Sequence, residues 1–194
     1  MMKKLLLAVF SITTTFSLYA QREVPQERME QIYEEVKTPY KYGLAIAPAD
    51  NHHKIDCPTV FRQGDKWLMT YVIYNGKSGT DGRGYETWIA ESDNLLEWRT
   101  LGRILSYRDG KWDCNQRGGF PALPDMEWGG SYELQTYKGR HWMTYIGGEG
   151  TGYEAVKAPL YIGLASTKGD ISTAHEWESL DKPILSIHDK DVQW

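Results

Sequence analysis

The sequence predicts an all-β fold of the β-propeller type, with a short N-terminal helix and about two blades present. Three observations support this: an internal repeat, a succession of short strand-like runs between turns, and many Trp and Tyr residues. The run Lys66–Tyr71 (KWLMTY) returns as Arg140–Tyr145 (RHWMTY), which sets a period of 74 between Tyr71 and Tyr145. A repeat of this length, made of β-rich runs and turns, is typical of stacked or radial β architectures.

Two further echoes extend the repeat towards the C-terminus. Ile89–Ser92 returns as Gly163–Ser166, again with a period of 74. Ile104–Ser106 returns as Ile184–Ser186 at a spacing of 80, which indicates six inserted residues. In a radial arrangement the inner strand of each unit starts near a central axis, so side chains from several units can meet there.

Residues 1–20 have the pattern of a secretory signal peptide. Met1–Lys4 is basic, Leu5–Phe10 is apolar, and Ser17–Ala20 offers the small residues of a cleavage site. The apolar stretch is too short for a membrane anchor, so no membrane insertion is expected after cleavage. The sequence therefore predicts a periplasmic or secreted protein.

Cleavage after Ala20 leaves residues 21–194, enough for one domain with a sizeable core. These residues keep 20 Lys and Arg against 26 Asp and Glu, a net charge of −6. A mildly acidic chain argues against a nucleic-acid partner, which favours a basic face. The 8 Trp and 13 Tyr, against 4 Phe, suit both β packing and binding surfaces.

The segment 21–40 is predicted to contain a helix over Gln26–Lys37. Its apolar residues recur at helical spacing and fall on one face, with charges on the other. These apolar residues are Met29, Ile32, Tyr33 and Val36. We expect the helix to pack against the main body.

Residues 41–194 are predicted to form a partial β-propeller domain. Runs with period two, or wholly apolar runs, alternate with Gly-containing turns, as in β-strands. The expected strands are Gly43–Ala47, Thr59–Gln63, Trp67–Tyr74, Thr87–Ser92, Trp98–Ile104, Tyr132–Tyr137, His141–Gly147, Leu160–Ala165 and Glu176–Leu180. Four antiparallel strands per unit describe a propeller blade, and a ring needs at least about four blades. The pattern therefore predicts a chain that is incomplete after Trp194; a small β-sandwich is the alternative.

Carboxylates at the entry of each unit are the first candidates for chemistry. Asp56 lies eight residues before the turn glycine Gly64, and Glu133 lies six residues before the corresponding Gly139. We expect both to project near the same end of the axis. Two carboxylates in one pocket are what hydrolysis of a glycosidic bond requires. The alternative role for each is the capping of a turn.

Four further residues are predicted to bind the substrate. Asp113 and Arg117 lie in a polar, Gly-rich loop, where Arg117 would clamp a hydroxyl or carboxylate bidentately or else form a surface salt bridge. Trp128 offers a flat face for stacking on a sugar ring, with core packing as the alternative. Trp88, in the strand expected at 87–92, completes the set.

Other signals in the sequence favour structural roles. Glu86 and Glu154 belong to a Gly-Tyr-Glu phrase that recurs at a spacing of 68, and a catalytic group would be needed only once. Cys57 and Cys114 form either a disulfide or two separate buried thiols. The adjacent histidines at 52 and 53 lack a spaced third ligand, and phosphate-binding and nucleophile-elbow motifs are absent. The sequence therefore predicts neither a metal nor a cofactor.

The run Asp56–Tyr71 resembles the first-blade signature of glycoside hydrolase family 43 and its relatives. In that signature an Asp-Pro step precedes a strand, a Gly-Asp turn and an aromatic-rich strand. Ser92–Trp98 is similar to the Ser-x-Asp-Leu-x-x-Trp element that closes blades in these proteins. The resemblance covers roughly Lys41 to the end of the chain. It implies a five-bladed β-propeller and an exported glycoside hydrolase that cleaves poly- or oligosaccharides.

The resemblance also implies an inverting mechanism. Asp56 would be the general base and Glu133 the second-blade carboxylate, while the general acid would lie beyond Trp194. Two features depart from the pattern: the family's Asp position falls on Cys57, and Glu133 stands where Asp is usual. A one-residue slip turns a strand side chain to the other face, and a bulge at this point would restore it. The alternatives are a non-catalytic carbohydrate-binding propeller and a propeller-type glycoside phosphorylase.

Overall fold

The computed structural model describes residues 24–37, 43–50, 52–76, 81–153 and 158–191. The chain divides into two compact units, Met1–Lys41 and Tyr42–Trp194. The predicted signal peptide lies outside the described residues.

The first unit contains the helix α1 (Gln26–Val36), as the spacing of apolar residues predicted. Pro25 precedes the helix with a φ of −53°, and the N–H of Lys37 closes its last turn on the carbonyl of Tyr33 at 2.8 Å. None of its residues is buried, so its packing against the rest of the chain stays a prediction. Among the described residues, no helix is long and apolar enough to cross a membrane.

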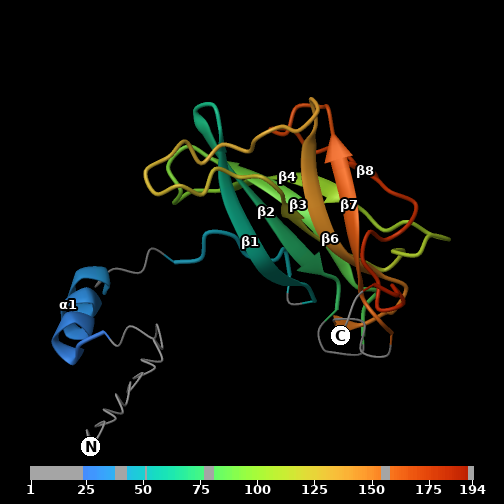
Figure 1. Ribbon diagram of the computed structural model, residues 1–194, viewed down its shortest axis with the longest axis horizontal. Coiled ribbons are helices and arrows are strands. Elements are labelled where there is room, and N and C mark those ends of the chain that lie inside the picture. The colour runs from blue at the N-terminus through green and yellow to red at the C-terminus, as the bar shows by residue number, and fades with distance from the viewer. Residues whose placement is uncertain (1–23, 38–42, 51, 77–80, 154–157, 192–194) are drawn as a thin grey trace, which may run out of the picture. The chain divides into compact units, whose positions relative to one another are not determined.

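In its described residues, the second unit contains eight strands that form one sheet (Figure 1). They are β1 (Lys54–Gln63), β2 (Lys66–Tyr74), β3 (Tyr85–Ser92), β4 (Arg99–Leu105), β5 (Gln116–Pro121), β6 (His141–Gly148), β7 (Tyr161–Thr167) and β8 (Glu178–Ser179). Strands β1–β4 form one antiparallel meander and β5–β8 form another. A parallel pairing of Tyr85 with Gln116 joins them. The predicted all-β class is confirmed, while the propeller and its number of blades stay predictions.

The repeated KWLMTY and RHWMTY runs lie on β2 and β6, the second strand of each meander. The register of the third strands differs by one residue from the predicted period. Met69 pairs with Ala90 on β3, whereas its counterpart Met143 pairs with Ala165 on β7, one residue further than the same period would place it. The period of 74 therefore holds for the second strands only.

Two hydroxyl groups show the same one-residue displacement from the period of 74. Ser92 Oγ accepts a hydrogen bond from the N–H of Asn94 at 3.2 Å, and Thr167 Oγ1 accepts one from the N–H of Gly169 at 2.9 Å. Both hydroxyls cap the turn that follows the third strand. Thr167, not Ser166, is thus the counterpart of Ser92.

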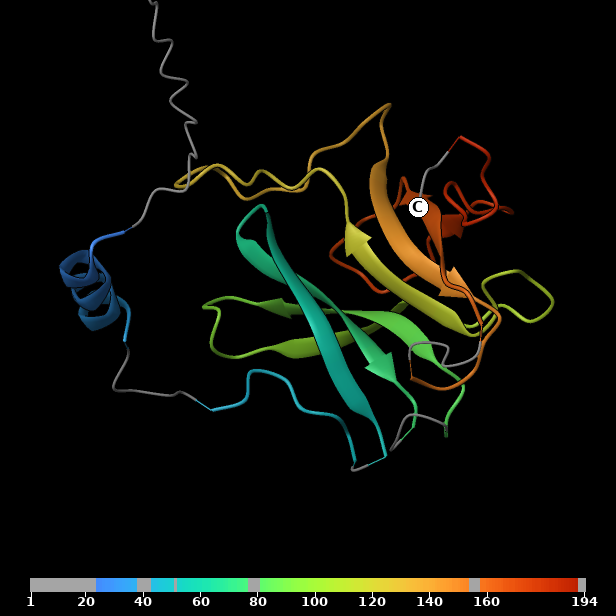
Figure 2. The same ribbon diagram turned by 60° about the horizontal axis from the view of Figure 1, so that its bottom comes forward.

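The structure corrects the prediction for the first strand of the second meander. This strand is β5 (Gln116–Pro121), which falls within the segment expected to be a polar loop. Tyr132–Tyr137 forms only isolated bridges, within a long excursion between β5 and β6 that runs beside the β1–β2 hairpin (Figure 2). The expected strand at Gly43–Ala47 is also not formed. Strand β5 shows no hydrophobic pattern because it contains two glycines, Gln116 and Arg117. The side chains of Gln116 and Arg117 are nevertheless buried.

The main hydrophobic core contains side chains from both meanders. Phe61 and Leu68 come from the first hairpin, and Met143 and Tyr145 come from β6; each is at most 1% exposed. Burial of such a side chain contributes about 1.5–3 kcal/mol relative to exposure. The shared core holds the two meanders together as one folded unit.

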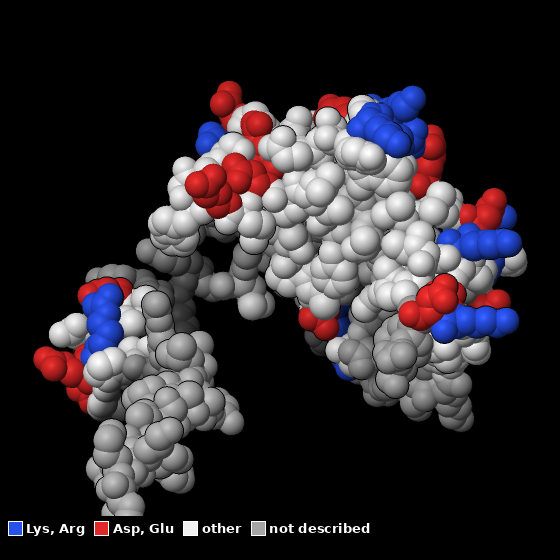
Figure 3. Space-filling view, viewed as in Figure 1, with Lys and Arg blue, Asp and Glu red and all other residues white. Residues whose placement is uncertain are grey.

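Charged side chains of the strand unit lie mainly at its edges on the face shown in Figure 3. Positive and negative groups stand next to one another there, and uncharged side chains cover the middle of that face. Exposed ion pairs of the strand unit include Lys66 with Asp93 and Lys111 with Asp181. This face therefore carries no basic patch of the kind that binds nucleic acid.

Candidate functional site

A β-bulge in β1 places Asp56. The register between β1 and β2 shifts between Asp56 and Thr59, so two residues, Cys57 and Pro58, stand opposite the single residue Tyr71. Cys57 has a φ of +51°, a conformation that residues other than glycine adopt rarely. Such bulges re-aim side chains at strand ends and next to active sites.

The bulge compensates for the one-residue displacement of Asp56 seen in the sequence. If the register of the later part of β1 continued, Cys57 would stand opposite Val72. The bulge brings Asp56 opposite Val72 instead, so its side chain shares the face of the sheet on which Val72 lies. Asp56 thus stands at the register position that Cys57 would otherwise hold, and its catalytic role stays a prediction.

Both oxygens of the Asp56 carboxylate accept hydrogen bonds. The N–H of Cys57 donates to Oδ1 at 2.7 Å, and the hydroxyl of Tyr153 donates to Oδ2 at 3.2 Å. The two donors come from different meanders, because Tyr153 lies in the segment between β6 and β7. They orient a side chain that otherwise faces solvent.

A cavity of about 220 Å³ opens at Asp56, where the two meanders meet. Five strands and the segment before β7 contribute to its wall. The lining residues are Asp56, Cys57, Val72, Tyr85, Gly118, Phe120, Ile146 and Leu160. A mostly apolar cavity with a single carboxylate is typical of a small-molecule site.

Three tyrosine rings gather beside this cavity. The ring of Tyr153 lies 5.4 Å from that of Tyr74 and 5.7 Å from that of Tyr85, and Tyr74 and Tyr85 are 5.5 Å apart. The ammonium of Lys54 lies 5.5 Å from the centre of the Tyr153 ring, within the range of a cation–π contact. Tyr74 and Tyr85 thus both pack against the ring of Tyr153.

The structure does not bring Glu133 to Asp56. Glu133 pairs with Arg62, six residues along β1 from Asp56, or about 20 Å of extended strand. The prediction aligned the turn glycines Gly64 and Gly139 and compared the carboxylates before them. In the structure the first strand of the second meander is β5, which ends before Glu133. In the second meander Gly118 lies opposite Ile146, just as Asp56 lies opposite Val72 in the first meander. Gly118 therefore occupies the position equivalent to Asp56.

Arg117 and Asp113 are fully buried and form an ion pair, with Nε of Arg117 3.2 Å from Oδ2 of Asp113. Arg117 also contacts Glu176 Oε1 through Nη1 at 2.6 Å and donates to the Ser179 hydroxyl. Arg108 donates to both oxygens of Asp113 at 2.7 and 2.8 Å. The predicted substrate contacts are therefore wrong for this pair, because both side chains are occupied and closed to solvent.

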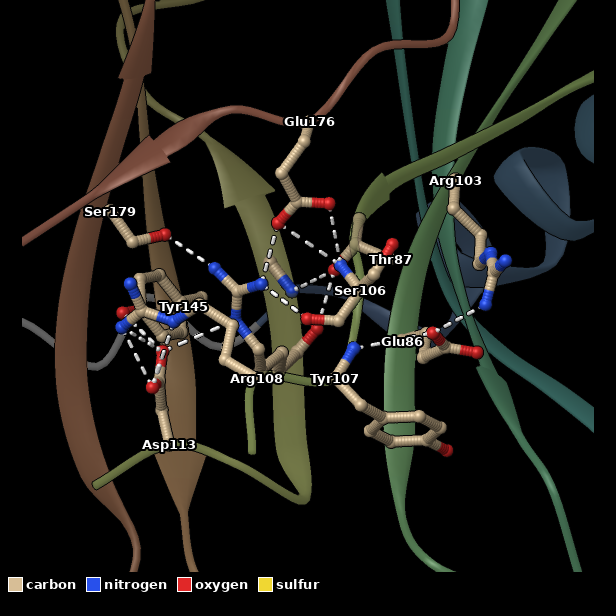
Figure 4. A network of polar contacts seen from close by, with 12 residues as sticks. Glu86, Thr87, Arg103, Ser106, Tyr107, Arg108, Asp113, Tyr145, Glu176 and Ser179 are labelled. Atoms are coloured by element: carbon tan, nitrogen blue, oxygen red, sulfur yellow. Dashed lines mark hydrogen bonds and ion pairs between the residues drawn. The ribbon is translucent and has the colours of Figure 1, made fainter. Parts of the chain in front are cut away.

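The same network includes the hydroxyl of Tyr145, which donates to Asp113 Oδ2 at 2.8 Å. Burial, and then Asp113, raise the pKa of Tyr145 to about 12, so the hydroxyl keeps its proton at neutral pH. Figure 4 shows Asp113 and Glu176 at opposite ends of the network, with Tyr145 and Arg108 beside Asp113. These contacts connect the segment before β5 with β6 and with the segment that leads to β8.

Comparisons with known proteins bear on what such a site does. No family model matches the sequence, and no curated protein matches it. Two solved structures are 93% identical to it over 89% of its length, each with a TM-score of 0.81. One is described as "Glycoside hydrolase" and the other as a complex of BT0996 with RGII.

This chain is similar to part of a glycoside hydrolase. It spans 49% of the length of each of these two solved proteins. A family 117 glycoside hydrolase, Zg3597 from Zobellia galactanivorans, is 11% identical with a TM-score of 0.47, over 67% of this chain and 38% of its own. Membership of family 43 stays a prediction.

The two predicted tryptophans do not line the cavity. Trp88 pairs with Tyr71, next to Val72 on β2, and therefore lies on the face of the sheet opposite to Asp56. It packs there in a second hydrophobic cluster. Trp128 lies in the excursion between β5 and β6 and is 97% exposed, which excludes core packing for it in the described residues.

The structure also shows the surroundings of Glu86 and of the two cysteines. Glu86 is buried against Arg103 at 3.0 Å and accepts from the N–H of Tyr107, in keeping with a structural role; Glu154 lies outside the described residues. In the described part of the chain, no disulfide joins Cys57 to Cys114. Burial raises the pKa of the Cys114 thiol, which keeps it protonated.

The sequence pattern did not single out Tyr153 as a site residue. Its Gly-Tyr-Glu phrase repeats the one at Tyr85, which predicts equivalent places in two units. The structure instead brings the two rings together, 5.7 Å apart, and the Tyr153 hydroxyl donates to Asp56. A spacing of 68, rather than the period of 74, was the available signal that the two tyrosines are not equivalent.

Proposed function

We propose that this protein is an exported glycosidase that hydrolyses glycosidic bonds of a poly- or oligosaccharide, on a five-bladed β-propeller. The observation that carries the proposal is the position of Asp56. The bulge directs its side chain toward the cavity between the meanders, and two donors orient its carboxylate. Near identity to part of a glycoside hydrolase supports the same activity.

In this proposal Asp56 is the general base. Donors to both oxygens fix the orientation of the carboxylate, and lone pairs remain on these oxygens to accept a proton from water. The water would attack the anomeric carbon while an acid protonates the leaving oxygen. The resemblance implies that this acid comes from a third blade, and Glu133 is too far along β1 to supply it.

The proposed substrate is carbohydrate of the RGII class. The solved structure described as a complex of BT0996 with RGII is 93% identical to this chain over the shared region, which supports a shared ligand. The apolar wall of the cavity suits the C–H face of a sugar ring, and the carboxylate at its edge suits the reacting bond.

The test is Asp56→Asn in the full-length protein that carries this sequence, with RGII oligosaccharide as substrate. Loss of the base should lower kcat/KM by about 10²–10⁴-fold with an unchanged melting temperature. Glu133→Gln is the matched control, since this carboxylate lies at the other end of β1, and it should retain activity. Wild-type activity in Asp56→Asn would overturn the proposal; inactivity of Glu133→Gln alone would move the site to that end of the strand.

A further inference from the structure

We propose that Tyr153 is a positioning residue that holds Asp56 in its reactive orientation, an inference that rests on the proposed role of Asp56. The Tyr153 hydroxyl and Asp56 Oδ2 are 3.2 Å apart, and the N–H of Cys57 holds the other oxygen. The amide fixes one end of the carboxylate through the backbone of its own strand. The tyrosine fixes the other end from the second meander.

The segment that carries Tyr153 is fastened to the body of the protein. Gln116, which is 1% exposed at the start of β5, donates through Nε2 to the carbonyls of Gly150 at 2.9 Å and Gly152 at 2.8 Å. The N–H of Gly152 donates to the carbonyl of Gly82 at 3.2 Å. The backbone directly before Tyr153 is therefore anchored to both meanders.

The ring of Tyr153 is held separately from its hydroxyl. It meets Tyr74 edge-on, at an interplanar angle of 86°, and contacts Tyr85 and the ammonium of Lys54. Because the packing involves the ring alone, Tyr153→Phe removes the hydrogen bond and leaves the packing in place.

A hydrogen bond to a charged group is worth one to two orders of magnitude in an equilibrium. Without the Tyr153 donor, the Asp56 carboxylate rotates more freely. The expected consequence is a lower kcat at a similar KM. A role in folding alone would not lower kcat in the folded protein.

The experiment compares Tyr153→Phe with wild type, in the full-length protein and with RGII oligosaccharide. We expect a fall in kcat of about tenfold to a hundredfold at a similar KM, and an unchanged melting temperature. In an Asp56→Asn background the same change should add nothing, because the two residues act as one unit. Tyr161→Phe is the matched control: it removes a hydroxyl bonded to His188 at 3.3 Å and should leave activity unchanged.

The outcomes separate this inference from the proposed function. If Asp56→Asn is inactive while Tyr153→Phe has the wild-type kcat, the positioning role is overturned and the glycosidase proposal stands. If Asp56→Asn is fully active, both are overturned. A lower melting temperature in Tyr153→Phe, with proportionate loss of activity, would assign the hydroxyl to folding and also overturn the positioning role.

Discussion

Arg117 and Asp113 illustrate how burial changes the meaning of a charged residue. In a polar, Gly-rich segment such residues suggest ligand contacts, yet each is 0% exposed and bonded to protein groups. Burial of an unpaired charge costs several kcal/mol, so each of the two depends on its partners. Their place in the fold is thus determined by electrostatics inside the protein.

We predict that Asp113→Asn destabilises the fold by about 3 kcal/mol, because Arg108 and Arg117 lose their shared counter-charge. Urea denaturation followed by tryptophan fluorescence measures this loss. Asp109→Asn is the control, since Asp109 is an exposed partner of Arg83, and its midpoint should not change. Equal midpoints for Asp113→Asn and Asp109→Asn would contradict the importance of the buried pair.

At the scale of elements, the bulge in β1 is the feature that positions the site. Cys57 adopts a left-handed conformation that costs roughly 1–2 kcal/mol for residues other than glycine. The rest of the strand and its pairing with β2 maintain it. Strain of this kind is found where a side chain must point in a particular direction.

Replacement of Cys57 by a β-branched residue should disturb this conformation. For Cys57→Val we expect a loss of stability of about 1 kcal/mol and a lower kcat, because Asp56 follows the backbone of the bulge. Cys57→Gly, which accepts a φ of +51° without strain, should retain activity. Calorimetry and steady-state kinetics test both. Normal stability and activity in Cys57→Val would show that the bulge tolerates any side chain.

Elements with a clear hydrophobic pattern are predicted from the sequence, and those without one are not. Strands β2, β3, β6 and β7 alternate or run apolar, and each falls within a few residues of its expected place. Strand β5 reads QRGGFP and gives no such pattern. Its two polar residues are buried through partners that are distant in the sequence, and local propensity carries no information about those partners.

At the scale of the whole molecule, acid should destabilise the fold in two separate pH ranges. Burial lowers the pKa of His141, and its buried Nδ1 has no hydrogen-bond partner among the described residues. The unfolded chain therefore binds a proton more readily, so stability is full above pH 6.5 and falls as the pH drops below it. Hydrogen bonds from the Ser131 and Ser172 segments lower the pKa of Asp125 and Asp170, which adds a second loss below about pH 3.8.

We predict that the melting temperature of wild type decreases between pH 7.5 and 5, and that His141→Gln removes most of this decrease. The later loss, below about pH 3.8, should be the same in both proteins because it comes from the carboxylates. Differential scanning calorimetry across the range measures both. A decrease between pH 7.5 and 5 of the same size in the variant would show that other groups cause it.

The sequence by itself determined the β class, the helix predicted over Gln26–Lys37 and the repeated second strands, and it singled out Asp56 as a candidate. These features depend on local patterns: the spacing of apolar residues, turn glycines and a motif of neighbouring residues. Tertiary structure alone decided that Glu133 lies far from Asp56, that Arg117 and Asp113 are buried, and that Tyr153 reaches the site. The reason is physical, since polar partners 30 to 97 residues apart in sequence meet only when the two meanders pack together.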